Sequence, residues 1–170
     1  GKGVDKRIDD MANAVRFGLT GFDLQEMELA YAPPFSSAKD PVNMAGYVIG
    51  NVIESLMKPF YVEDLDRIPE DAVRLDVRTP EECQRGMSTG YQYSSGFLKR
   101  THWVSLIGKR ILYITCQIGL RGYLAQRILD QAGFKTWNLS GGYRLYEMVK
   151  KDEAAMAAVA GMCTECGKEL

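Results

Sequence analysis

The fold is decided by the stretch Arg110-Ile-Leu-Tyr-Ile-Thr-Cys116-Gln-Ile-Gly-Leu-Arg-Gly122-Tyr-Leu-Ala-Gln-Arg-Ile-Leu129. Residues 111–114 form a short apolar run with β-branched and aromatic side chains, which predicts a buried parallel strand. From Gly122 onward the apolar residues take a helical spacing. They are Leu124, Ala125, Ile128, Leu129 and Ala132. The stretch therefore predicts a strand and a helix joined by a loop at residues 116–121.

This loop places Cys116 at the carboxyl end of a strand and in front of a helix N-terminus. Backbone N–H groups gathered at such a junction stabilise a thiolate and an anion bound beside it. Gly119 and Gly122 let the backbone curl without a Cβ clash, so several amides can point inward. The pattern predicts a cradle for a nucleophilic cysteine.

Two other interpretations of Cys116 stay open. Buried intracellular cysteines are commonly inert, and a cysteine at a strand end fits that role too. A phosphatase loop also sets a cysteine ahead of an arginine, but it needs a longer spacing than the four residues between Cys116 and Arg121. The shorter ring suits one sulfur atom on the cysteine better than a phosphoryl group, which favours sulfur transfer.

Three motifs together resemble a rhodanese domain. They are Cys116-Gln-Ile-Gly-Leu-Arg-Gly122, Leu75-Asp-Val-Arg-Thr-Pro-Glu-Glu82 and Asn138-Leu-Ser-Gly-Gly-Tyr143. More narrowly, the chain resembles the rhodanese domain fused to flavin-dependent coenzyme A-disulfide reductases and persulfide reductases. The resemblance implies that Cys116 carries a persulfide, which the loop residues Gln117, Ile118, Gly119, Leu120, Arg121 and Gly122 surround.

Charged residues near this loop have two interpretations each. Asp76 and Arg78 at a strand end either shape an active-site rim or, as we expect, support the loop as an ion pair. Arg121 either binds an anionic group of the sulfur donor or holds the loop by pairing with Asp76 or a backbone carbonyl. We favour the second role for Arg121.

Residues 58–150 are expected to form a small rhodanese-like α/β domain with a mostly parallel sheet. Strands are predicted at 60–62, 73–78, 111–114 and 136–139, alternating with helices. Thr79, Pro80 and Glu82 predict a capped helix start, and Gly141-Gly142 opens a last helix. The reactive loop should lie at the carboxyl ends of the strands.

Residues 1–57 predict helices at 1–18, from Asp23 towards Tyr31, and after the N-cap Asp40. The apolar stripe of the third helix is interpreted as a core face; its members are Ala45, Val48, Ile49, Val52, Ile53 and Leu56. The resemblance identifies 1–57 as the end of the flavoprotein's dimerisation domain, with Tyr31 near the partner subunit's substrate site. It also implies a homodimer.

No Gly-x-Gly-x-x-Gly follows a predicted strand, so no FAD or NADH site is expected in this chain. FAD, NADH and coenzyme A are implied only for the full-length family, of which this chain would be the back portion. A net charge of −1 indicates no nucleic-acid partner, and no apolar run has membrane-spanning length. With no signal peptide or disulfide framework, a cytoplasmic location is expected.

Residues 87–108 break the pattern, because serines, glycines and scattered aromatics stand where a buried central strand is expected. Read one base out of frame, Tyr91 to Gly96 can encode Ile-Asn-Ile-Pro-Val-Asp, and Gly90 alanine. We hypothesise two compensating frameshifts; a genuine divergent loop is the alternative. His102, the only histidine, lies here and receives no catalytic role.

The segment 151–170 is expected to be a tail, with Cys163 and Cys166 in a Cys-x-x-Cys pair. Such a pair can be a redox dithiol, half of a zinc site, or a tail with no set role; no metal site is predicted. The sequence as a whole predicts a sulfurtransferase that takes sulfur from a small donor and passes it to a thiol. The alternative is a non-catalytic module that dimerises or docks through residues 1–57.

Overall fold

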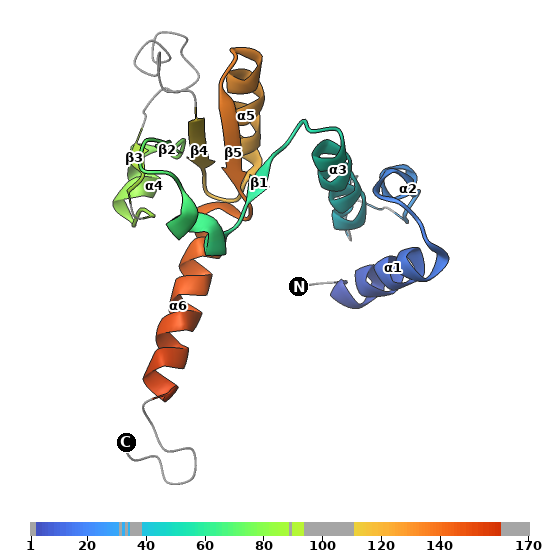
Figure 1. Cartoon of the computed structure of the whole chain (residues 1–170). Coiled ribbons are helices and arrows are strands. Elements are labelled where there is room, and N and C mark those ends of the chain that lie inside the picture. The colour runs from blue at the N-terminus through green and yellow to red at the C-terminus, as the bar shows by residue number, and fades with distance from the viewer. Residues whose placement is uncertain are drawn as a thin grey trace. The chain divides into compact units, whose positions relative to one another are not determined.

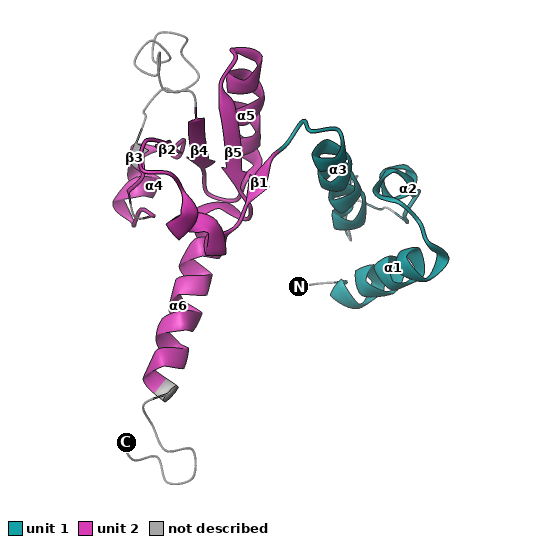
Figure 2. Ribbon diagram, in the orientation of Figure 1, with its two compact units in different colours: residues 1–57 teal, residues 58–170 magenta. Residues whose placement is uncertain are grey.

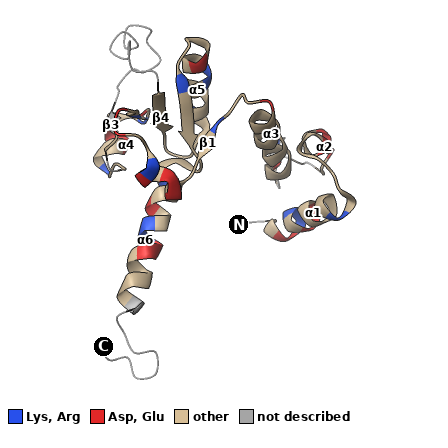
Figure 3. Cartoon of the chain, in the orientation of Figure 1, with Lys and Arg blue, Asp and Glu red and all other residues tan. Residues whose placement is uncertain are grey.

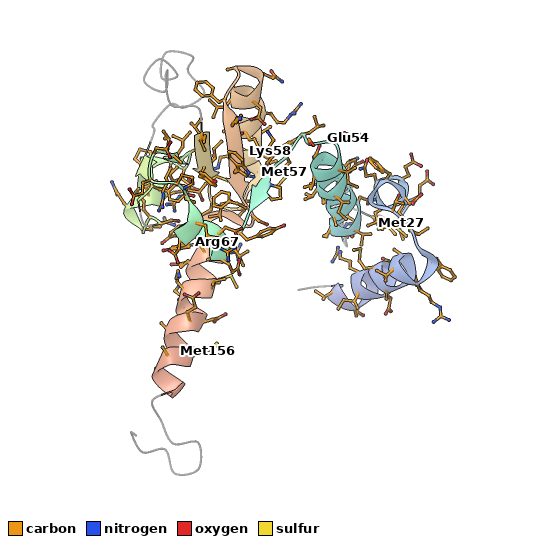
Figure 4. The ribbon with its side chains drawn as sticks, viewed as in Figure 1. Met27, Glu54, Met57, Lys58, Arg67 and Met156 are labelled. Atoms are coloured by element: carbon orange, nitrogen blue, oxygen red, sulfur yellow. The ribbon has the colours of Figure 1, made fainter. Side chains whose placement is uncertain are left out.

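The computed structural model describes residues 3–30, 32, 34, 39–88, 90–93 and 111–160. The chain divides into two compact units, residues 1–57 and residues 58–170, coloured separately in Figure 2. The division falls between Met57 and Lys58, both labelled in Figure 4, and this is also the boundary between the ranges 1–57 and 58–150 of the sequence analysis.

Unit 1 contains three helices, α1 (Val4–Phe17), α2 (Gly21–Glu26) and α3 (Pro41–Ile53). As predicted, Gly18 ends α1 in the left-handed conformation, and Asp40 caps α3 by accepting from the Val42 N–H. The second helix is shorter than predicted. It ends at Glu26. The side-chain amide of Asn43, a residue of α3, donates hydrogen bonds to the carbonyls of Leu24 and Met27.

The interpretation of the α3 stripe as a core face is wrong for most of its members. Val48, Ile49, Val52 and Ile53 are all exposed, and the buried residues of the helix are Val42, Asn43, Gly46 and Gly50. The small residues face inward because α2 packs too closely for a side chain. A Cβ on Gly46 would lie 2.7 Å from the Gly21 carbonyl oxygen.

Unit 2 is a parallel sheet with helices on its faces (Figure 1). Its strands are β1 (Pro59–Phe60), β2 (Val73–Asp76), β3 (Gln92–Tyr93), β4 (Ile111–Thr115) and β5 (Lys135–Leu139). They lie in the order β1-β5-β4-β2-β3, and every pairing is parallel. The predicted α/β class is therefore confirmed, with the four predicted strands present.

The order of the strands brings the β4 end to the middle of the sheet. Thr115, the last residue of β4, is opposite Asp76 at the end of β2, and Ile114 is opposite Asn138 on β5. Cys116 thus follows the central strand and has strand ends on both sides.

Three helices and a 3-10 segment complete unit 2: η1 (Val62–Arg67), α4 (Pro80–Gln84), α5 (Leu120–Gln131) and α6 (Gly142–Ala160). Ala125 and Leu129 of α5 pack on β2 and β4 in one core cluster. Leu124, predicted on that face, is instead exposed. Gln126 is buried in the helix and donates its side-chain amide to the Thr136 carbonyl, which satisfies both polar groups.

α6 extends well past the sheet in Figure 1 and continues beyond residue 150. Residues 151–158 are thus helical and exposed, although the sequence analysis places them in a tail. Charged residues of both signs line this helix in Figure 3, where Lys150 pairs with Glu153 and Lys151 with Glu147. Cys163 and Cys166 lie outside the described residues.

Candidate functional site

The predicted cradle is built around Cys116, whose side chain is fully buried at the end of β4. The backbone N–H of Gly119 donates a hydrogen bond to the Cys116 Sγ at 3.0 Å. Gly119 can turn its amide this way because its φ of 111° is open to glycine and strained for other residues. The helix α5 begins one residue later, so the sulfur also lies before a helix N-terminus.

The carbonyl groups of the loop are held from outside by α6 and β5. Tyr143 and Arg144, in the first turn of α6, donate their backbone N–H groups to the carbonyls of Cys116 and Gln117 at 2.8 and 3.1 Å. This contact requires a glycine at 142, where a Cβ would lie 2.4 Å from the Cys116 carbonyl oxygen. The glycine pair predicted to open the last helix therefore also holds the loop.

Asn138 binds the other end of the loop. Its Nδ2 donates to the Gly119 carbonyl at 3.0 Å, and the residue is buried to 1% exposure. It lies against Gly122, where a Cβ would come within 2.1 Å of the Asn138 Oδ1. Gly122 is therefore needed for close packing of α5 against β5 as well as for the turn.

Asp76 and Arg78 form a fully buried ion pair beside the loop. The Arg78 guanidinium donates to both carboxylate oxygens of Asp76, with the shortest contact at 2.7 Å, and to the Gly86 carbonyl. The same guanidinium lies 4.0 Å from the centre of the Tyr143 ring. The pair joins β2 to α4 through the Glu82 carbonyl and to α6 through the Tyr143 ring, and its supporting role stays a prediction.

Arg121 pairs with Glu82 on α4. Its two terminal nitrogens donate to the two carboxylate oxygens at 2.8 and 2.7 Å. The hydrogen bonds from Arg121 lower the pKa of Glu82 to about 2. Glu82 also closes the capping box of α4 with Thr79, so one carboxylate joins α4 to the start of α5. The partner of Arg121 is therefore Glu82 rather than Asp76.

Two further side chains of the loop are apolar, and Gln117 between them and Cys116 is half-buried. Ile118 and Leu120 are both exposed, on either side of Gly119. Cys83 is the other described cysteine, and burial, followed by the nearby Asp76 carboxylate, raises the pKa of its thiol. Within the described ranges, no group of three or more His, Cys, Asp or Glu side chains could hold a metal ion.

Comparison with known proteins gives matches over both units. Coenzyme A disulfide reductases from Staphylococcus haemolyticus and Staphylococcus aureus match at 58% identity over 45 residues and 54% over 46, in the N-terminal part of the chain. Each match spans 10% of the relative. No protein-family profile matches the sequence.

Among solved structures, the reduced Bacillus anthracis CoADR-RHD matches 87% of this chain at 40% identity, with a TM-score of 0.79. The NAD-dependent persulfide reductase from A. fulgidus matches 82% of the chain at 38% identity, with a TM-score of 0.70. The chain spans 27% and 25% of those two chains. It carries a rhodanese-like domain of the coenzyme A disulfide reductase and persulfide reductase type. The expected family is confirmed.

In this rhodanese-like domain, two functional contacts were missed from the sequence. Asn138 appears there only as part of a family motif, and Glu82 as part of a family motif and of a capping box. Neither local pattern indicates a contact with the cysteine loop, because both partners lie far along the chain. Tyr31, His102, Cys163 and Cys166 fall outside the described residues, so the interpretations placed on them stay predictions.

Proposed function

We propose that this chain is a sulfurtransferase module with Cys116 as its nucleophile. The observation that carries the proposal is the hydrogen bond from the Gly119 N–H to the Cys116 sulfur, in a loop held on both sides. A backbone amide directed at sulfur stabilises a thiolate and, after reaction, a persulfide anion. An inert buried cysteine would not require this arrangement.

The reaction consists of two exchanges at sulfur. The Cys116 thiolate attacks the outer sulfur of a donor persulfide, RS–SH; the S–S bond breaks, RS⁻ leaves, and Cys116 becomes Cys–S–SH. An acceptor thiolate then attacks the outer sulfur of the Cys116 persulfide, forms its own persulfide, and returns the Cys116 thiolate. Sulfur is neither gained nor lost overall, and no separate oxidant or reductant is needed.

The residues around the loop favour donors without a strong negative charge. Arg121 is the only cation of the 116–121 segment, and its charge is balanced by Glu82. The exposed Ile118 and Leu120 give the loop an apolar rim. A small organic persulfide is therefore the proposed donor and a small thiol, such as coenzyme A, the proposed acceptor. FAD and NADH have no proposed site in this chain.

Intact mass spectrometry tests the proposal. After incubation with an organic persulfide, the wild-type chain should gain one sulfur atom on Cys116, and a thiol acceptor should remove it. The variant Cys116→Ser should lose that gain and the turnover, while Cys83→Ser should keep both. Full sulfur transfer by Cys116→Ser would show that the nucleophile is assigned wrongly.

A second candidate function is self-association through unit 1. It is favoured by the exposed apolar side chains of α1 and α3, which include Ile8, Val15, Val48, Val52 and Ile53. Contiguous apolar surface on one small unit commonly marks an interaction site. The two functions are compatible, since the cysteine loop belongs to unit 2.

A further inference from the structure

The carbonyl groups of the Cys116 loop are the starting point. A trans peptide is planar, and its C=O and N–H point in opposite directions. Holding a carbonyl from outside the loop therefore turns the N–H of the next residue to the other side. The bonds from α6 to the Cys116 and Gln117 carbonyls thus turn the amides of Gln117 and Ile118 inward.

At the other end of the loop, the Gly119 carbonyl has two donors. The Tyr123 N–H of α5 donates at 2.9 Å, and the Asn138 Nδ2 donates at 3.0 Å from β5. The first bond belongs to the helix and directs the carbonyl along α5. Asn138 is thus the contact from outside the loop and its helix that holds the peptide between Gly119 and Leu120.

We infer that Asn138 is a positioning residue, which aims the amide of Leu120 at the sulfur that Cys116 carries, beside the Gly119 amide that already bonds that sulfur. The inference rests on the proposed function, which identifies that sulfur as the transferred atom. The direction of the amide rests on the hydrogen bonds of the loop alone. The Asn138 Nδ2 is bonded to the Gly119 carbonyl, so Asn138 acts on the sulfur through the loop backbone. Its Oδ1 has no hydrogen-bond partner among the described residues, so the residue keeps a buried unpaired oxygen there while its amide binds the loop.

A buried polar atom without a partner is costly, and an apolar residue of similar size would avoid that cost. The structure therefore holds an amide where packing alone would favour leucine. Gly122 is consistent with this, because its missing side chain leaves the space that the Asn138 Oδ1 occupies.

The test compares Asn138→Leu and Asn138→Thr with the wild type and with Thr136→Val. Thr136 is a matched control: it is buried on the same strand and face, and its hydroxyl bonds Asp130 at 2.7 Å, with no contact to the loop. The first readout is the rate at which iodoacetamide alkylates Cys116 at neutral pH, mapped by peptide mass. Cys83 in the same sample serves as the reference for general loosening of the fold.

We expect both Asn138 variants to slow alkylation of Cys116 roughly tenfold, because a hydrogen bond to a charged group is lost or misdirected. Thr136→Val should stay within about twofold of the wild type. In steady-state sulfur transfer, the Asn138 variants should lower kcat and leave KM unchanged, since Asn138 does not reach the donor. Threonine is a strand-forming residue, so Asn138→Thr should fold. Its alkylation rate decides the test if Asn138→Leu does not fold.

Unchanged alkylation of Cys116 in a folded Asn138 variant would overturn the inference. So would an equal loss in Thr136→Val, which would show a general effect of destabilising β5. Alkylation requires no sulfur transfer. A wild type that never gains sulfur would therefore refute the proposed function, while the alkylation rates would still decide the role of Asn138.

Discussion

Glu82 has two contacts, one within α4 and one to α5. It accepts the Thr79 N–H at the start of α4, and it binds Arg121 in the first turn of α5 with both oxygens. The carboxylate belongs to a capping box, so contacts within α4 fix its position independently of Arg121. Arg121 is therefore bound by a preorganised partner, and its charge at the end of the loop is balanced by Glu82.

This pair predicts how stability responds to acid. The pKa of Glu82 is lowered from 4.5 to about 2, so its contribution is present above pH 4.5 and is lost as the pH falls through 2. Because Arg121 is 41% exposed, solvent reduces the contribution to about 1 kcal/mol. Urea unfolding of the wild type between pH 4.5 and 2 should show this loss, and Glu82→Gln should lack it.

Glu70→Gln is the matched control, since Glu70 is an exposed carboxylate of the same unit. It should follow the wild-type curve. Parallel curves for the wild type and Glu82→Gln would mean that the ion pair adds nothing to stability.

At the scale of the elements, the segment from residue 87 gives the sheet one of its two short edge strands. The expected strand exists, but as the two-residue β3 at the edge, paired with β2, and not as a central strand. Ser88 and Tyr91 beside it are buried, and neither hydroxyl has a hydrogen-bond partner in the part of the chain that the structure describes. Burial raises the pKa of Tyr91, so its hydroxyl keeps its proton as a buried donor. The hypothesis of a shifted reading frame stays a prediction, and such polar atoms in a core are what it would produce.

Removing the Tyr91 hydroxyl should stabilise unit 2. Tyr91→Phe keeps the ring in its core cluster and removes an unpaired polar group, for a gain of about 1 kcal/mol. The melting temperature should rise by roughly 4–8 °C. Replacing residues 90–94 by Ala-Ile-Asn-Ile-Pro should raise it further, if the frame is shifted.

Tyr61→Phe, at an exposed tyrosine, should leave the melting temperature unchanged. A lower melting temperature for Tyr91→Phe would show that the hydroxyl is not misplaced. Sequencing the DNA across codons 84–110 decides the frame itself: the hypothesis requires an intact alternative frame with no change of length.

At the scale of the whole molecule, the two units differ in how they cover their apolar residues. Unit 2 has two core clusters around the sheet, whereas the cluster of unit 1 contains only Ala14, Leu24 and Val42 as fully buried members. Val15 of α1 is 79% exposed and Ile53 of α3 is 60% exposed. Such a unit gains stability when a second surface covers its helices.

Among the described residues, no helix is both long and apolar enough to cross a membrane.

We therefore expect the chain to form dimers at micromolar concentration. Analytical ultracentrifugation of the wild type should show a concentration-dependent dimer, and Val15→Glu with Ile53→Glu should shift it to monomer. Both positions are already exposed, so the charges should cost little folding stability. Met156→Glu, at an exposed position of α6, should leave the dimer intact. A wild type that remains monomeric at high concentration would exclude self-association.

The sequence by itself determined the elements whose causes are local. The strand, loop and helix around Cys116, the N-caps Asp40 and Thr79, and the end of α1 at Gly18 all follow from residues within one turn of each other. Neighbours at such short range are close in space in any fold that forms the element. The cysteine and the glycines of its loop could therefore be recognised without knowing what surrounds them.

The tertiary structure alone decided which partners complete the site and which faces are covered. Glu82 meets Arg121, and Asn138 meets Gly119, because the order β5-β4-β2 brings three strand ends together. The periodicity of α3 marks an apolar stripe, but only close packing of its glycines against α2 shows that the stripe stays exposed. A pairing across the sheet depends on the strand order and not on local preference, so no neighbouring residue in the sequence predicts it.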